Sequence, residues 1–84
     1  METLDKVKAV KRKHEDELLK KRNVVGVGIG YKEISGQMTE ELSLVVMVKT
    51  KIPSHELDPI DRIPREIEGI RTDVKAVGEV RALR

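Results

Sequence analysis

Three glycines, Gly26, Gly28 and Gly30, have the spacing that most suggests chemistry, because glycine-rich runs can cradle phosphate groups. Such loops place their glycines in a turn that opens a helix, whereas these alternate with β-branched residues. The dinucleotide pattern also fails, because the positions that need its third glycine hold Tyr31 and Glu33. The run therefore predicts no phosphate or cofactor site.

The same glycines predict a strand with one full face and one bare face, because successive strand residues point to opposite sides. Glycine within a strand often marks a place where another part of the chain approaches closely. We interpret Gly26, Gly28 and Gly30 as close-packing residues, and we expect the preceding helix to lie over Gly28.

The other side chains that do chemistry are sparse and scattered. His14 and His55 are the only imidazoles and the chain has no cysteine, so no ligand spacing for a metal is present. The serines lack a nearby His and Asp arrangement, and Asp58 and Asp61 are typical of turn capping in a proline-rich loop. The sequence thus predicts no catalytic residue, no metal ligand, no cofactor and no enzymatic activity.

Composition predicts one small domain over residues 1–84, with a core built from aliphatic side chains because Tyr31 is the only aromatic. The absence of cysteine excludes a disulfide framework. No apolar run has the length of a signal peptide or a membrane span, so we expect a cytoplasmic protein with no membrane partner.

Residues 3–22 have the periodicity of an amphipathic helix. Leu4, Val7, Val10, His14 and Leu18 recur every three or four residues and form one stripe, and a stop follows at Asn23. Val7, Val10 and Leu18 should be buried.

The first 22 residues contain eight basic and five acidic residues, a net charge of +3, within a chain of net charge +2. A solvated helix face with acidic neighbours explains this charge. The alternative, a nucleic-acid-binding face, lacks stacking aromatics and a binding motif, so we expect no nucleic-acid partner.

The rest of the chain predicts strands at about 24–32, 41–50, 66–71 and 73–82. Ser35-Gly36-Gln37 indicates a hairpin, for which a loop longer than two residues fits best. Leu42 to Val48 is apolar on both faces, as expected of a central strand. The expected fold is α+β, with an N-terminal amphipathic helix packed on a small, mainly antiparallel three- to four-stranded sheet.

Several segments together resemble the N-terminal region of bacterial proteins in which a chymotrypsin/trypsin-like serine peptidase domain follows. They are Asn23 to Tyr31, Leu42 to Val48, Lys51-Ile52-Pro53, Ile63-Pro64, Thr72-Asp73-Val74 and Val77-Gly78-Glu79. The peptidase domain is missing here, so none of the family's catalytic residues carries over. The resemblance implies a non-catalytic accessory or pro-domain-like module that contacts a peptidase domain in cis or in trans.

The exposed strand edges of so small a sheet favour homo-oligomers. A rival hypothesis is therefore a self-associating or partner-binding module with no connection to a peptidase. Arg84 matches the residue after which trypsin-like enzymes cut, since their acidic pocket pairs with the guanidinium, which makes it a candidate processing site. A designed boundary and a natural stop codon are the alternatives.

Overall fold

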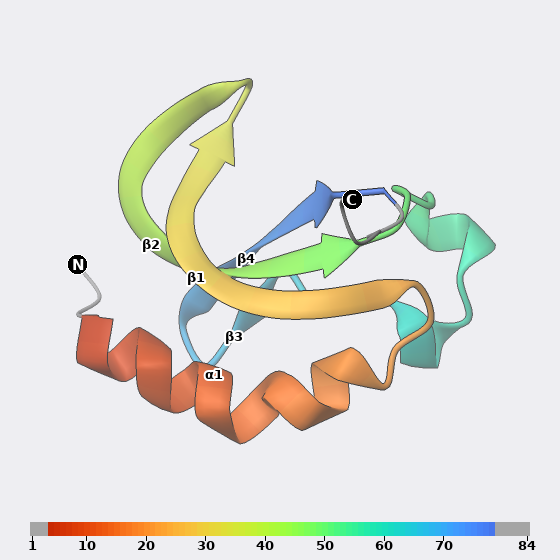
Figure 1. Ribbon diagram of the computed structural model, residues 1–84, viewed down its shortest axis with the longest axis horizontal. Helices are drawn as coiled ribbons and strands as arrows, with labels where there is room; N and C mark the ends of the chain where they lie inside the picture. The colour runs from red at the N-terminus through yellow and green to blue at the C-terminus, as the bar shows by residue number, and fades with distance from the viewer. Residues whose placement is uncertain (1–3, 79–84) are drawn as a thin grey trace, which may run out of the picture.

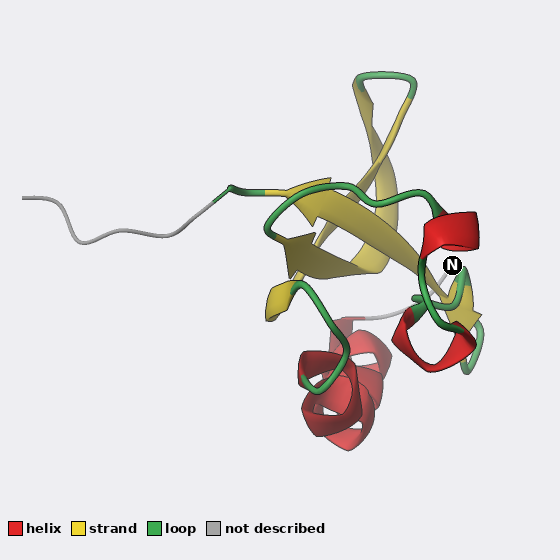
Figure 2. Cartoon of the chain, turned by 90° about the vertical axis from the view of Figure 1, so that its right-hand side faces the viewer, coloured by secondary structure: helices red, strands yellow, loops and turns green. Residues whose placement is uncertain are grey.

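The computed structural model describes residues 4–78, which form one helix packed on a four-stranded mixed sheet (Figures 1 and 2). The sheet order is β1-β2-β4-β3, with β1 and β3 at its edges. The expected α+β fold is confirmed. Element bounds in chain order are α1 Leu4–Leu19, β1 Val24–Ile34, β2 Gln37–Val48, β3 Glu66–Ile67 and β4 Ile70–Ala76.

Helix α1 packs on one face of the sheet and supplies three of the eight buried apolar side chains among residues 4–78. Val7, Val10 and Leu18 are buried, as their spacing predicts, whereas Leu4 at the start of the stripe is exposed. The helix ends before Asn23, which adopts a left-handed conformation with φ of 77° and so turns the chain into β1. The periodicity therefore located the buried face, but the helix is shorter at its C-terminus than the 3–22 expected.

Strand β2 is central, as expected from its apolar residues on both faces. It pairs antiparallel with β1 and parallel with β4. Leu44, Val46 and Val48 on its helix-facing side are buried in two clusters, one with Val7 and one with Leu18. A strand hydrogen-bonded on both sides and covered by a helix has little solvent contact, which explains its composition.

The β1–β2 hairpin differs from expectation at its turn. Strand β1 runs to Ile34 and β2 begins at Gln37, so the connection is the two-residue turn Ser35-Gly36 and not a longer loop. Both turn residues have positive φ, 51° and 79°, a conformation that matches the twist of the strands it joins. The tight turn lets both strands continue further than the expected 24–32 and 41–50.

The chain between β2 and β4 makes two single 3₁₀ turns, Ser54–Glu56 and Pro59–Asp61, before the short strand β3. The Glu68-Gly69 turn then reverses the chain into β4, with φ of 51° and 84°. Strands were expected at 66–71 and 73–82; instead β3 ends at Ile67, four residues early, and β4 begins at Ile70, three residues early. Residues of the second beyond Gly78 lie outside the described part.

The glycine-bearing face of β1 lies opposite the helix, so the expectation that Gly28 packs under α1 is wrong. A Cβ atom built at Gly26 or Gly30 would meet Met47 or Val45 on the face of β2 that points away from α1. Toward that face the hairpin curls, as Figure 1 shows. Bare backbone on the inner side of the curl leaves room for this bend.

Two contacts hold the curled hairpin over the sheet. The Glu33 backbone N–H donates to Oδ2 of Asp73 at 3.0 Å, and Nζ of Lys32 donates to the Thr72 carbonyl at 3.1 Å. Asp73 is buried and so gains the partner that its burial requires. The end of the hairpin is thus fixed to β4 across the face of β2 that points away from α1.

The glycine face generates the first prediction. Gly28→Ala should raise the free energy of unfolding by about 0.5–1 kcal/mol, because its Cβ would lie 3.8 Å from Met47 and alanine is the better strand residue. Gly30→Ala is the matched control, since its Cβ would lie 3.2 Å from Val45 and the gain should be smaller or reversed. Urea unfolding measures both, and greater destabilisation by Gly28→Ala would contradict this packing.

The core generates the second prediction. Leu18 is 2% exposed and packs with Val27, Val46 and Val48, so Leu18→Ala should cost about 2–5 kcal/mol of unfolding free energy. Leu19→Ala, at an adjacent exposed position, should cost far less. Equal losses in chemical denaturation would mean that α1 does not pack on its own sheet.

Candidate functional site

The side chains singled out for chemistry do not converge. His14 lies against Glu68, His55 sits on an exposed 3₁₀ turn, and Oδ1 of Asp61 accepts from the Arg22 backbone N–H at 2.9 Å. Among residues 4–78 no group of three His, Asp or Glu side chains is placed to hold a metal ion. The structure therefore gathers none of these side chains into a catalytic arrangement.

Two side chains of α1 contact the carboxylate of Glu68. Nε2 of His14 lies 2.6 Å from its Oε2, and Nζ of Lys13 lies 3.4 Å from the same oxygen. The His14 hydrogen bond, assisted by Lys13 and opposed by desolvation, holds the pKa of Glu68 below its ordinary value of 4.5. Because Glu68 lies in the β3–β4 turn, these contacts tie that turn to α1.

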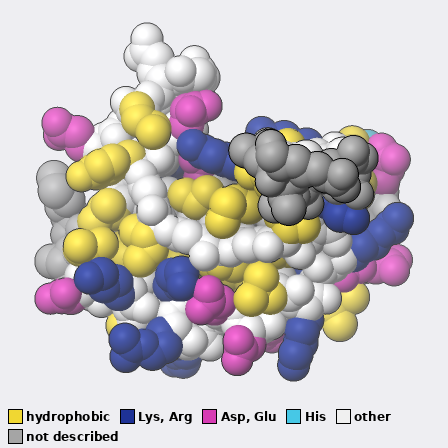
Figure 3. All heavy atoms as spheres, viewed as in Figure 1, with side chains coloured by type: hydrophobic (Ala, Val, Ile, Leu, Met, Phe, Trp, Pro, Cys, Tyr) yellow, Lys and Arg dark blue, Asp and Glu magenta, His cyan; other side chains and the backbone are white. Residues whose placement is uncertain are grey.

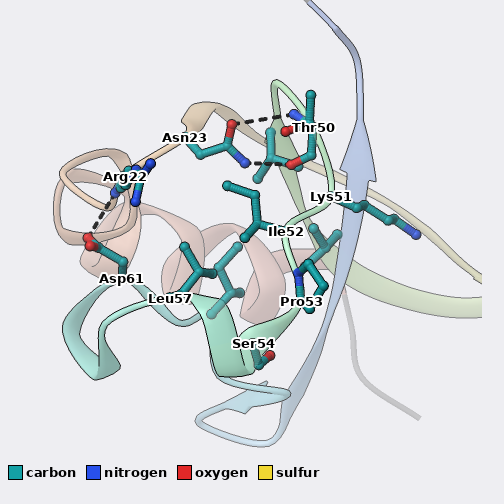
Figure 4. A pocket seen from close by; sticks show the side chains of 12 residues that line it. Arg22, Asn23, Thr50, Lys51, Ile52, Pro53, Ser54, Leu57 and Asp61 are labelled. Atoms are coloured by element: carbon teal, nitrogen blue, oxygen red, sulfur yellow. Dashed lines mark hydrogen bonds between the residues drawn. The ribbon is translucent and has the colours of Figure 1, made fainter.

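A pocket of about 420 Å³ lies where α1 ends, beside the 3₁₀ turns (Figure 4). Ile52 and Leu57 point into it, whereas the Lys51 side chain points away. Asn23 holds its rim through hydrogen bonds between its amide and the backbone of Thr50. The pocket combines an apolar lining with polar residues, and two of these, Arg22 and Asp61, are hydrogen-bonded to each other.

The second surface feature is the free edge of β1. This 11-residue strand is hydrogen-bonded to β2 on one side and has no strand on the other within residues 4–78. Beside it, Lys8, Lys11, Arg12 and Glu15 of α1 line a groove with Ile29. The edge therefore combines unpaired backbone with a charged helix flank.

Apolar side chains are exposed along the same hairpin. Val25, Tyr31, Ile34 and Met38 are 40%, 50%, 45% and 64% exposed, and Figure 3 shows apolar side chains gathered on this side of the molecule. The only aromatic of the chain is thus on the surface and not in the core. Exposed large apolar side chains near a free strand edge are typical of contact surfaces.

The charges of the helix flank are unevenly paired. Nζ of Lys11 lies 2.9 Å from Oε2 of Glu15, an ion pair one helical turn apart that agrees with the expected solvated face. Lys8 and Arg12 are exposed and form no hydrogen bond or ion pair with the described residues. The sequence reasoning missed this groove because its residues come from two elements, although Lys8 and Arg12 do share one side of the predicted helix.

The comparisons with known proteins identify the family. A model of the NARROW LEAF 1 N-terminal domain matches residues 2–78. The chain belongs to that family. Among curated proteins, none matches it.

This NARROW LEAF 1 N-terminal domain match corrects the resemblance drawn from the sequence. The chain is not assigned to the N-terminal regions of bacterial serine peptidases, and the match gives no evidence of a peptidase or of a bacterial source. The peptidase partner that the resemblance implied loses its support. Arg84, the expected processing site, lies outside the described residues.

No helix in residues 4–78 combines the length and apolar character needed to cross a membrane.

The Glu68 contacts generate the third prediction. A carboxylate whose pKa is lowered by folding adds stability above its ordinary pKa, and that stability is lost as the pH falls through the folded value. Glu68→Gln should therefore lower the melting temperature at neutral pH, and its difference from the parent should shrink as the pH falls below 4.5. Glu66→Gln, an exposed neighbour whose side chain forms no bond to the described residues, is the control. A difference that persists unchanged in acid would contradict the assignment.

Proposed function

We propose that this domain is a non-catalytic module that binds another protein by adding an extended segment to the free edge of β1. The observation that carries the proposal is the one-sided pairing of this long strand. A strand edge presents unpaired N–H and C=O groups that an incoming chain can pair with. Backbone hydrogen bonds would supply affinity, and neighbouring side chains would supply selectivity.

The neighbourhood of β1 supports this binding mode. Val25 and Tyr31 are exposed on the strand, so an incoming chain would cover apolar surface as well as backbone. The groove beside Ile29 has a volume of about 370 Å³, room for side chains of the added strand on the helix side. We include a cytoplasmic location in the proposal, which cell fractionation tests.

Self-association through the same edge is the second candidate. The edge is self-complementary in principle, because two copies of β1 could pair antiparallel about a two-fold axis. Such pairing brings Lys8 and Arg12 of one copy toward the same residues of the other, and like charges oppose contact. We therefore rank a different partner above a second copy.

A peptide selection with structural mapping tests the proposed function. Random octapeptides displayed on phage are selected on the domain, and each binder is titrated into isotopically labelled protein followed by amide NMR. The expected result is that shifts and slowed amide exchange concentrate in Val24–Ile34.

Amide shifts also separate the alternatives. If a peptide changes the amide chemical shifts of residues 50–63 only, it binds in the pocket of Figure 4, and that result would overturn strand addition. Light scattering on the unliganded domain distinguishes a monomer from a self-associated dimer. Edge pairing of two copies would double the molar mass, and the dimer fraction would rise with protein concentration.

A further inference from the structure

We propose that the chain added to β1 is an extended peptide in which acidic residues alternate with bulky apolar ones, its carboxylates facing Lys8 and Arg12. This inference rests on the proposed function and names the partner's chemistry. The two faces of β1 present different groups to a peptide strand added at its edge. On the helix side the charged neighbours are Lys8, Lys11 and Arg12 with one carboxylate, Glu15, and on the opposite side β1 carries glycines.

The helix side supplies the charge complementarity. Lys11 is already paired with Glu15, which leaves the positive charges of Lys8 and Arg12 without a partner among the described residues. Both side chains line the groove with Ile29, beside the position that an added strand would occupy. A carboxylate there gains attraction from both cations, whereas a basic side chain is repelled.

The distance between Lys8 and Arg12 along the helix matches the distance between alternate residues of a strand. Lys8 and Arg12 are four residues apart, about 6 Å along a helix axis at about 1.5 Å per residue. Residues i and i+2 of a strand share a face and lie about 6.6 Å apart. Because α1 runs alongside β1 in Figure 1, two alternate acidic residues of an added strand would each lie near one cation.

The opposite face favours apolar side chains in the positions between the acids. Between Gly26 and Gly30, β1 has no side chain on this face, so a large neighbour can pack across the bare backbone. The nearest groups it would reach are Val45 and Met47 of β2, both half-buried. Burial of these side chains by an apolar residue is favourable, whereas a charge placed over the glycines would lose hydration.

The same reasoning argues against β1 of a second copy as the occupant. On the helix side that strand carries Val27 and Ile29, which offer no charge to Lys8 and Arg12. On the other face it carries glycines, which would leave Val45 and Met47 uncovered. A peptide with alternating acidic and apolar residues places carboxylates near Lys8 and Arg12 and covers Val45 and Met47 on the other face.

The test compares three seven-residue peptides, each labelled with fluorescein, in which valine alternates with glutamate, glutamine or lysine. The glutamate peptide should bind most tightly, and replacement of glutamate by glutamine should raise Kd at least about fivefold. The affinity of the glutamate peptide should fall as salt rises, while that of the glutamine peptide should change little. Amide NMR confirms that each bound peptide lies along β1.

Charge variants of the domain complete the test. Lys8→Glu with Arg12→Glu should reduce the affinity for the glutamate peptide and raise that for the lysine peptide. The matched control is Lys49→Glu with Arg65→Glu, two exposed cations outside the groove that form no side-chain bond to the described residues. If the charge reversal unfolds the domain, as judged by circular dichroism, Lys8→Gln with Arg12→Gln replaces it.

The outcomes separate this inference from the proposed function. Equal binding of all three peptides along β1 would overturn the acidic preference and leave strand addition standing. Absence of shifts in β1 with every peptide would overturn both. A loss of affinity equal in the groove variant and its control would show a net-charge effect and overturn the assignment to Lys8 and Arg12. A doubled mass of the unliganded domain would make a second copy the occupant and overturn the acidic peptide.

Discussion

Burial of β2 against α1 is the interaction on which the rest of this structure depends. Leu44, Val46 and Val48 are almost completely buried, and Val7 and Leu18 cover them from the helix. With a single, exposed aromatic in the chain, these aliphatic contacts supply most of the hydrophobic stabilisation available to so small a domain. Each neighbouring element is positioned by its attachment to this pair.

The curled hairpin follows from the same arrangement. Since α1 occupies one face of β2, β1 bends toward the other, and its glycines allow the bend. Contacts of Lys32 and Glu33 with β4 secure the far end. The free edge of β1 is thereby placed between a charged helix flank and a face that is bare from Gly26 to Gly30. The same strand thus packs on β2 at one edge and offers the proposed binding surface at the other.

Periodicity predicted the parts of the structure that depend on a single element. The stripe of Val7, Val10 and Leu18 and the central position of Leu42 to Val48 were both correct, because burial imposes a regular pattern on each. Which partner covers a face is not encoded by alternation, and for that reason Gly28 was assigned to the helix and lies on the opposite face. The hairpin at Ser35-Gly36 was located correctly, but a longer loop was expected, because serine in a left-handed conformation is a weak local signal for a two-residue turn.

The candidate site was harder to foresee for a related reason. The groove forms only when α1 packs beside β1, which brings Lys8 and Arg12 next to Ile29. No sequence motif links these three residues. The family model matches residues 2–78, and this match overturns the peptidase resemblance, which rested on short segments.

The central claim is that the free edge of β1 is the binding surface. Intermolecular NOEs between the alternating valine–glutamate peptide and the labelled domain test it most directly, because a paired strand places backbone protons of the two chains in register. We predict NOEs from the peptide backbone to Val25, Val27 and Ile29. NOEs confined to Ile52 and Leu57 in the pocket of Figure 4 would contradict the account.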